Sequence, residues 1–229
     1  MASRPLQVIR RASFRAVPWK NGGGITHEAL RVPAAGDSFH WRVSVAQVDG
    51  SGPFSDFAGY RRYMTLLEGA GIALRFGDGT NKALRRAGEL AEFDGAMTTY
   101  GELIDGPCRD LNLIVAKSMG AAVSVEWARG RLRGDEDRSP GSGEDRSQGS
   151  GEDQPAGSGR AAPLRIEASP GQTVLMSPID GAVVLALDDG ESATLERWDL
   201  AVLSKGTVQT EASARDPVMV FVATLDVAR

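Results

Sequence analysis

Short segments in which apolar and polar residues alternate constrain the fold of this chain more than any other feature. In residues 62–67 the side chains of Arg62, Met64 and Leu66 fall on one face of an extended segment, and residues 72–76 repeat the period of two. The pattern recurs at residues 41–46, 183–187, 193–195, 199–203 and 218–225. Turns rich in glycine and aspartate separate many of these segments. The alternation predicts an all-β fold of short antiparallel strands, with a hairpin formed by residues 62–67 and 72–76.

One segment, residues 134–159, has a different composition from the rest. It holds seven glycines, five serines and seven acidic residues, and it contains no Val, Ile, Leu, Met, Phe, Tyr or Trp. GSGEDRSQ is followed directly by GSGEDQPA, which indicates growth by repeat expansion. Because such a segment cannot bury enough apolar surface to offset its ordering entropy, it is predicted to be a disordered linker. The predicted division is a first half at 1–118, a connecting segment at 119–133, the linker, and a second half at 160–229.

Charge and hydropathy exclude several classes of partner. The formal net charge is -4 and no basic run is present, so no nucleic acid partner is expected. No stretch approaches the ~20 apolar residues of a membrane span, and the first residues lack the apolar run of a secretion signal. A cytoplasmic protein that does not enter the membrane is therefore expected. Cys108 is the single cysteine, which excludes an internal disulfide; a small buried apolar role is favoured over an activated thiol.

Five separated motifs resemble the HutD/Ves family. They are WKNGGGIT at 19–26, WRVSVA at 41–46, GPFSDFAGYRRYMTLLEG at 52–69, FDG at 93–95 and GPCRDLNLI at 106–114. The resemblance covers roughly the first 118 residues. It implies a bicupin, with two cupin-like antiparallel β-barrel halves of the RmlC-like jelly-roll type. It also implies a link to histidine utilisation, a role as a small-molecule sensor or modulator, and no established reaction.

The three glycines of WKNGGGIT, at positions 22–24, allow two interpretations. Glycine is used where the backbone takes positive φ or passes very close to another group, so the triplet is either a shaped backbone beside a ligand or a flexible turn. The flanking residues Asn21 and Thr26 carry hydrogen-bonding side chains. The family resemblance places both near the mouth of the first barrel.

The strand at residues 41–46 carries Arg42 and Ser44 on one face and two valines on the other. Either the valine face packs the core and the polar face looks outward, or the polar face lines the barrel lumen and points at a ligand. Arg62 shares its face with apolar residues, and a buried arginine requires a carboxylate. That carboxylate belongs either to Asp110, in a pair that ties two strands together, or to an acidic metabolite clamped by the guanidinium.

Residues 110–114 place Asp110 and Asn112 on one face of a strand. The resemblance puts the matching positions at the mouth of the first barrel. One departure is Arg61, where the family usually has an acidic or neutral residue, which puts the local charge in doubt. The candidate ligand-binding residues are Asn21, Thr26, Arg42, Ser44, Arg62, Asp110 and Asn112.

Metal and cofactor chemistry find little support in the residues. The chain has only two histidines, His27 and His40, so a three-histidine site is impossible. A site built from both histidines and Glu28 is one alternative; surface or hydrogen-bonded histidines are the other. No P-loop, dinucleotide fingerprint or GxSxG elbow is present, and we expect neither a metal nor a cofactor.

The favoured function is non-enzymatic binding of a small anionic metabolite, such as urocanate or formylglutamate, that modulates histidine utilisation. A first alternative is a metal-independent isomerase, epimerase or lyase with Asp110 or Glu28 as base and His40 as acid. A second is a module that binds a protein partner, with the acidic linker as a tether. The residues leave a homodimer open.

Overall fold

The computed structural model describes residues 5–19, 23–33, 38–128, 163–211 and 217–226. This part of the chain forms strands β1 to β19 and one short 3-10 helix, η1 (Arg11–Ser13), and all strand pairs are antiparallel. The all-β prediction is therefore confirmed. The predicted linker at 134–159 and the candidate residue Asn21 lie outside the described residues. No helix in the described ranges is long and apolar enough to cross a membrane.

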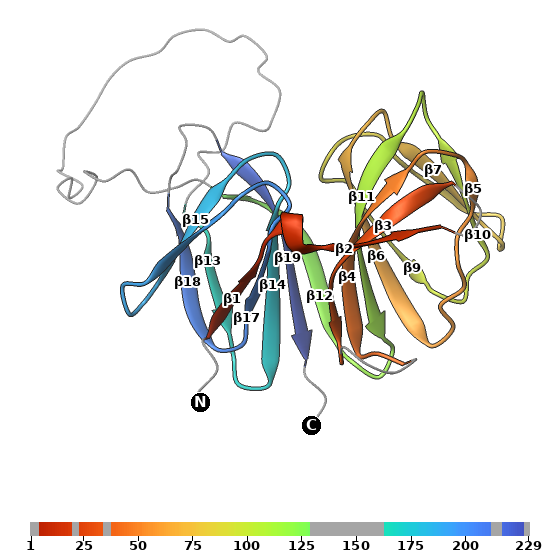
Figure 1. The fold of residues 1–229 in the computed structure, drawn as a ribbon. Helices are drawn as coiled ribbons and strands as arrows, with labels where there is room; N and C mark the ends of the chain where they lie inside the picture. The colour runs from red at the N-terminus through yellow and green to blue at the C-terminus, as the bar shows by residue number, and fades with distance from the viewer. Residues whose placement is uncertain (1–4, 20–22, 34–37, 129–162, 212–216, 227–229) are drawn as a thin grey trace, which may run out of the picture.

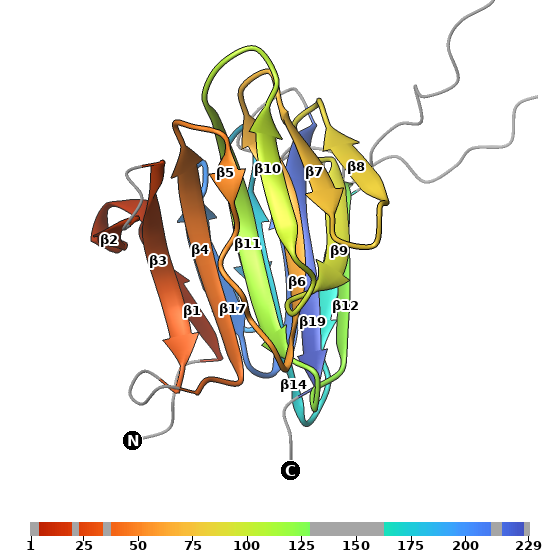
Figure 2. The same ribbon diagram turned by 90° about the vertical axis from the view of Figure 1, so that its right-hand side faces the viewer.

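The first half consists of two sheets that face each other (Figure 2). The six-stranded sheet has the order β2 (Arg15–Pro18), β3 (Gly24–Val32), β4 (Trp41–Val48), β11 (Cys108–Ala116), β6 (Tyr60–Glu68) and β9 (Leu90–Asp94). The four-stranded sheet has the order β5 (Gly52–Pro53), β10 (Thr99–Leu103), β7 (Ile72–Phe76) and β8 (Asn81–Leu84). An apolar cluster lies between them and includes Met64, Leu66 and Leu74.

The predicted hairpin between residues 62–67 and 72–76 is wrong. β6 pairs with β11 and β9, whereas β7 pairs with β10 and β8, so the turn after Glu68 carries the chain from one sheet to the other. Gly69 makes this corner with a φ of 100°. A Cβ at this position would lie 2.6 Å from the carbonyl oxygen of Pro107, closer than a real Cβ contact. Glycine thus fits both the positive φ and the close approach to Pro107 at the corner where the chain changes sheets.

The second half repeats the arrangement with a five-stranded and a four-stranded sheet (Figure 1). The five-stranded sheet has the order β1 (Leu6–Ile9), β17 (Leu200–Leu203), β14 (Gln172–Pro178), β19 (Val218–Asp226) and β12 (Ala121–Ala128). The other has the order β13 (Arg165–Ala168), β18 (Gly206–Glu211), β15 (Val183–Leu187) and β16 (Ser192–Leu195). The turn at residues 188–190 joins β15 and β16 in a hairpin.

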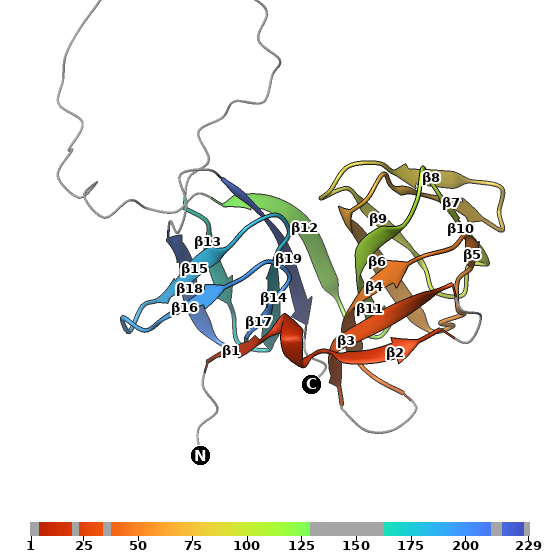
Figure 3. The same cartoon turned by 45° about the horizontal axis from the view of Figure 1, so that its top comes forward.

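Two strands cross the predicted division of the chain. β1 was assigned to the first half, yet it pairs with β17 in the second half, and β12, assigned to a connecting segment, pairs with β19 in the same sheet. Figure 3 shows η1 between β1 and β2, where the chain passes from one half to the other. Local alternation finds a strand but does not say which sheet it joins, so this exchange could not be read from the pattern.

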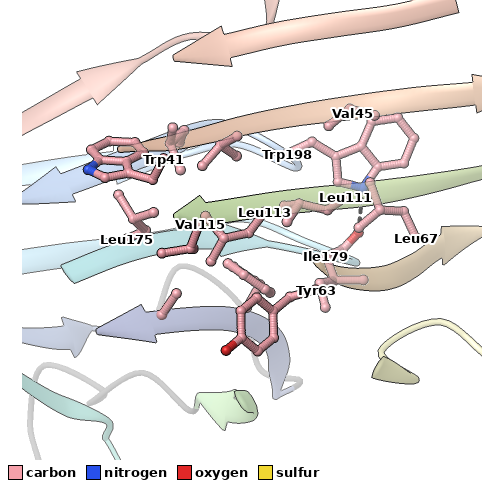
Figure 4. Packing of buried hydrophobic residues seen from close by; sticks show 14 of the residues in the cluster. Trp41, Val45, Tyr63, Leu67, Leu111, Leu113, Val115, Leu175, Ile179 and Trp198 are labelled. Carbon is pink, nitrogen blue, oxygen red and sulfur yellow. Dashed lines mark hydrogen bonds between the residues drawn. The ribbon is translucent and has the colours of Figure 1, made fainter. Parts of the chain in front are cut away.

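A continuous apolar cluster joins the two halves (Figure 4). Trp41, Val43 and Val45 of β4 contribute to it from the first half, and Leu175 and Phe221 contribute from the second half. The six-stranded sheet is therefore covered on both faces, by its own small sheet on one side and by the second half on the other. The two predicted orientations of β4 do not exclude each other: the valine face packs in the core, and the polar face also points into the protein.

Candidate functional site

A cavity of about 630 Å³ lies in the first half, beside the β2–β3 edge of the six-stranded sheet. Strands β2, β3, β4, β6 and β11 supply one wall, and residues 53–57 supply the other. It is lined by Arg15, Val17, Pro18, Trp19, Thr26, Glu28, Arg31, Arg42, Ser44, Ala46, Pro53, Phe54, Ser55, Phe57, Arg62, Asp110 and Asn112. Four arginines against two acids give the lining a formal surplus of positive charge.

A chain of three side chains occupies the innermost wall. Arg62 Nη2 donates to Asn112 Oδ1 at 2.8 Å, and Asn112 Nδ2 in turn donates to Asp110 Oδ1. Arg62 is only 6% exposed and Asp110 only 1%. The direct Arg62–Asp110 ion pair considered from the sequence is not formed, because Asn112 stands between them. Neither Asp110 Oδ2 nor Arg62 Nε has a hydrogen-bond partner among the described residues.

Phenyl rings hold the two inner guanidinium groups. Arg62 Cζ lies 4.9, 5.5 and 5.1 Å from the ring centroids of Phe54, Phe57 and Phe93. Arg42 Cζ lies 5.0 Å from the centroid of Phe57, so this ring contacts both cations. Contacts of this kind favour a cation over a ring face without neutralising its charge. The rings therefore pack against both guanidinium groups and leave their charge available to an anion.

Burial is the main cause of the pKa shifts of the charged residues in this wall. Desolvation raises the pKa of Asp110 from its ordinary value to about 7, and the nearby Arg62 and the hydrogen bond from Asn112 offset only part of that rise. Desolvation also lowers the pKa of Arg62 to about 10. The pKa of Arg42 is lowered by burial, and Glu28 counteracts part of that effect. The site thus holds cations that stay charged at neutral pH beside a carboxyl group that titrates there.

The outer part of the cavity is more polar and better paired. Arg15 Nη2 lies 3.0 Å from Glu28 Oε1, and Trp19 Nε1 donates to Thr26 Oγ1 at 2.8 Å. β3 begins at Gly24, which lies so close to β4 that a Cβ on residue 24 would be 2.2 Å from the carbonyl oxygen of Gln47. The third glycine of the triplet therefore serves a close strand-to-strand approach.

The structure brings six of the seven candidate residues to this cavity: Thr26, Arg42, Ser44, Arg62, Asp110 and Asn112. Whether they bind a ligand stays a prediction. Arg61 does not line the cavity; it points from the other face of β6 and pairs with Glu92. Its charge is therefore directed away from the candidate site.

The candidate residues chosen from the sequence did not include four residues that line the cavity: Arg15, Arg31, Phe54 and Phe57. The position of Arg31 could not be predicted from alternation, because the register of β3 shifts between Glu28 and Leu30 and places Arg31 opposite Arg42. A bulge breaks the period of two, so simple alternation assigns the wrong face beyond it. Arg15 lies on the short edge strand β2, which has no alternation of its own.

The remaining titratable candidates lie elsewhere. Neither His27 nor His40 lines the cavity, and His27 pairs in register with Val45, which lies in the core between the halves. In the described residues no three His, Cys, Asp or Glu side chains are grouped closely enough to hold a metal ion, so the His27, His40 and Glu28 set is not assembled. Cys108 is buried, and burial raises its pKa to about 12, which matches the expected apolar role.

Comparison with known proteins agrees with the motifs. The HutD family profile matches residues 11–139, which is more than half of the chain. The chain belongs to the HutD family. It is 39% identical over 129 residues to an uncharacterized 21.2 kDa protein in the hutC 3' region of Pseudomonas putida, covering 56% of this chain and 67% of that protein. It is 36% identical over 100 residues to protein Ves of Citrobacter koseri, covering 43% of this chain and 52% of Ves, so it spans about half of that relative.

Solved structures extend the similarity of this HutD family chain to its second half. A conserved protein of unknown function from Pseudomonas aeruginosa PAO1 is 29% identical, with a TM-score of 0.73. The match covers 96% of this chain and 98% of that chain. HutD from Pseudomonas fluorescens SBW25 is 24% identical, with a TM-score of 0.67. That match covers 96% of this chain and 97% of that chain. An oxalate decarboxylase is 11% identical, with a TM-score of 0.55, and the match covers 99% of this chain and 78% of that chain. This similarity shows the fold alone.

Proposed function

We propose that this HutD family protein binds a small carboxylate-bearing metabolite in the cavity of its first half, without transforming it, and thereby modulates histidine utilisation. Urocanate and formylglutamate are the compounds we favour. The name of the Pseudomonas putida relative, which refers to the hutC region, supports the link to histidine utilisation. We further propose that each half is a cupin-like barrel, which makes the whole chain a bicupin.

The observation that carries this proposal is the lack of ion pairs at the two inner arginines, Arg62 and Arg42, among the described residues. Arg62 is buried and Arg42 is partly buried, yet neither forms an ion pair with a carboxylate of the described residues. A buried guanidinium is costly to keep without a partner, and a carboxylate is the group that matches its donors in pairs. A small organic acid would supply that partner.

The cavity also suits such a ligand in size and surface. Its volume of about 630 Å³ lies in the range of small-molecule sites, which are mostly apolar with a few placed polar groups. Phe54, Phe57 and Trp19 provide flat apolar surface, while the arginines provide the anchor for charge. The rival enzymatic reading has less support, since His40, its proposed acid, does not line the cavity.

Binding of urocanate and N-formylglutamate should be measured by calorimetry on three proteins: wild type, Arg62→Met and Arg61→Met. Because hydrogen bonds to charged groups contribute about 1.5 to 3 kcal/mol, we expect Arg62→Met to weaken binding roughly ten- to a hundredfold. Arg61→Met is the matched control, since it removes the same charge from the adjacent residue, whose exposed side chain does not line the cavity. It should bind as wild type does.

Thermal unfolding of the same proteins separates a binding role from a structural one. If neither acid raises the melting temperature of the wild type and Arg62→Met alone lowers it strongly, Arg62 is a structural residue and the binding proposal fails. An equal loss of affinity in both variants would also contradict a specific role for Arg62.

A further inference from the structure

Asp110 stands out within the cavity because only one of its oxygens is used. Oδ1 accepts a hydrogen bond from Asn112, whereas Oδ2 has no partner among the described residues. The carboxyl group is 1% exposed and belongs to the cavity wall. An ionised carboxylate in such a place lacks both water and a second donor, and this is costly. A protonated carboxyl group would instead hold a hydrogen-bond donor at Oδ2.

The charges around Asp110 come from every strand of the cavity wall. They are Arg62 on β6, Arg42 on β4, Glu28 and Arg31 on β3, and Arg15 on β2; the Cys108 thiol on β11 itself is titratable but stays neutral, since burial raises its pKa. The opposite wall, residues 53–57, contains one acid, Asp56, which is exposed and does not line the cavity. Arg62 is the cation that acts most directly on Asp110. Glu28 is already paired with Arg15. An anion that binds at Arg62 and Arg42 would therefore compete with Asp110 for the same positive charge.

We propose that Asp110 takes up one proton from solvent when the carboxylate ligand binds, and that its Oδ2–H then donates to a ligand carboxylate oxygen. This inference rests on the proposed function. The proton comes from water or buffer, adds to Oδ2 and stays there while the ligand is bound; no bond of the ligand breaks. Asp110 would then determine specificity, because the site recognises an acceptor oxygen as well as a negative charge.

Like charges at close range explain the coupling. Two carboxylates that share one site cannot both stay ionised at ordinary cost, so one of them holds a proton. The pKa of Asp110 in the free protein is about 7, so its protonation needs little additional free energy at neutral pH. The ligand carboxylate, held by two guanidinium groups, would keep its charge, and Asp110 would be the member of the pair that is protonated.

Calorimetry can count the proton. Binding of N-formylglutamate at pH 8 would be measured in HEPES and in Tris, whose ionisation enthalpies differ, and the difference in observed enthalpy gives the number of protons taken up. The carboxyl groups of this probe titrate near pH 4, far below the range used. We expect an uptake of about one proton at pH 8, and a Kd that rises about tenfold per pH unit above pH 7.

Asp110→Asn is the decisive variant, since an amide can donate a hydrogen bond but cannot titrate. It should bind with no proton uptake and with a Kd that does not depend on pH between 7 and 9, whereas Glu28→Gln, the control acid at the same cavity, should keep the proton uptake. Saturable binding to wild type without proton uptake would overturn this inference and leave the proposed function intact. Uptake that persists in Asp110→Asn would also overturn it, by placing the proton on another group.

A measurement on the wild type keeps the test independent of how well the variant folds. Carboxyl carbon NMR of aspartate-labelled protein should show one resonance whose midpoint near pH 7 moves upward by about two pH units or more on saturation with N-formylglutamate, as an uptake of about one proton at pH 8 requires. A midpoint that stays in place on saturation would contradict the inference. Absence of any binding by the wild type would overturn both the proposed function and the inference.

Discussion

At the scale of single residues, the alternation of side chains along three strands is enough to assemble most of the candidate site. Arg42 and Ser44 share a face of β4, Asp110 and Asn112 share a face of β11, and these faces meet because the strands are neighbours in one sheet. Ser44 pairs directly with Asn112. The period of two could not place Arg31, because the bulge in β3 changes its face.

The role of Asn112 as a bridge was also beyond the pattern. One of the two alternatives taken from the sequence paired Arg62 directly with Asp110, whereas the structure places the Asn112 amide between these two charged groups. An amide can accept from the guanidinium and donate to the carboxyl group at the same time. The register between β6 and β11 places Arg62 opposite Ile114, which is closer along β11 to Asn112 than to Asp110. This register, which the sequence pattern does not give, decides between a direct pair and a bridged one.

Asp110 makes the stability of the ligand-free protein depend on pH. Its pKa is about 7 in the folded protein and near 4 when unfolded, so its favourable contribution is fully present below pH 4 and is lost as the pH rises to 7. Between pH 5 and pH 8 we expect the free energy of unfolding of wild type to fall relative to Asp110→Asn, by on the order of 2 to 4 kcal/mol. Urea denaturation of both proteins across this range would measure it, and parallel pH profiles would contradict the assignment.

At the scale of elements, the corner after β6 shows why strand pairing is harder to predict than strands. Residues 62–67 and 72–76 are both strands, and the short turn between them favours a hairpin. Instead the turn changes sheets, which the positive φ of Gly69 and its contact with Pro107 allow. A glycine before a strand has the same appearance in the sequence whether the chain folds back or crosses over.

Two glycine substitutions separate the causes at this corner. Gly69→Ala introduces both positive-φ strain and a Cβ that overlaps the Pro107 carbonyl, whereas Gly79→Ala introduces only the strain, because its Cβ would have nothing within 4 Å. Positive φ alone costs on the order of 1 kcal/mol for alanine. We expect Gly79→Ala to lose about that amount and Gly69→Ala to lose at least 1 kcal/mol more. Equal losses in chemical denaturation would show that the contact with Pro107 can relax.

At the scale of the whole molecule, the two halves are bound together by exchanged segments as well as by a shared core. β1 completes the five-stranded sheet of the second half, and Asp199 accepts hydrogen bonds from Arg10 Nη1 at 2.7 Å and from the backbone of Arg11 at 2.8 Å. Arg11 and Arg197 lie 4.5 and 4.3 Å from the ring centroid of Trp198 at the same junction. The halves therefore share an exchanged strand and an apolar core.

Removing residues 1–10 tests this arrangement. The truncated protein would lose β1 and the Arg10–Asp199 ion pair, and it would leave β17 as an unprotected sheet edge. We expect a clearly lower melting temperature and self-association that increases with concentration, because exposed edges pair with other chains. Light scattering and thermal unfolding would measure both effects. A monomer with unchanged stability would show that β1 contributes little to the fold.

The exchange of β1 also sets an order of events on the ribosome. β1 ends at Ile9 and its partner β17 begins at Leu200, so the strands between them are synthesised before this pair can form. Until then β1 has no partner in its own sheet and is open to pairing elsewhere. A bulky insertion directly before Leu6 would delay this late pairing step and should lower the folding yield after translation.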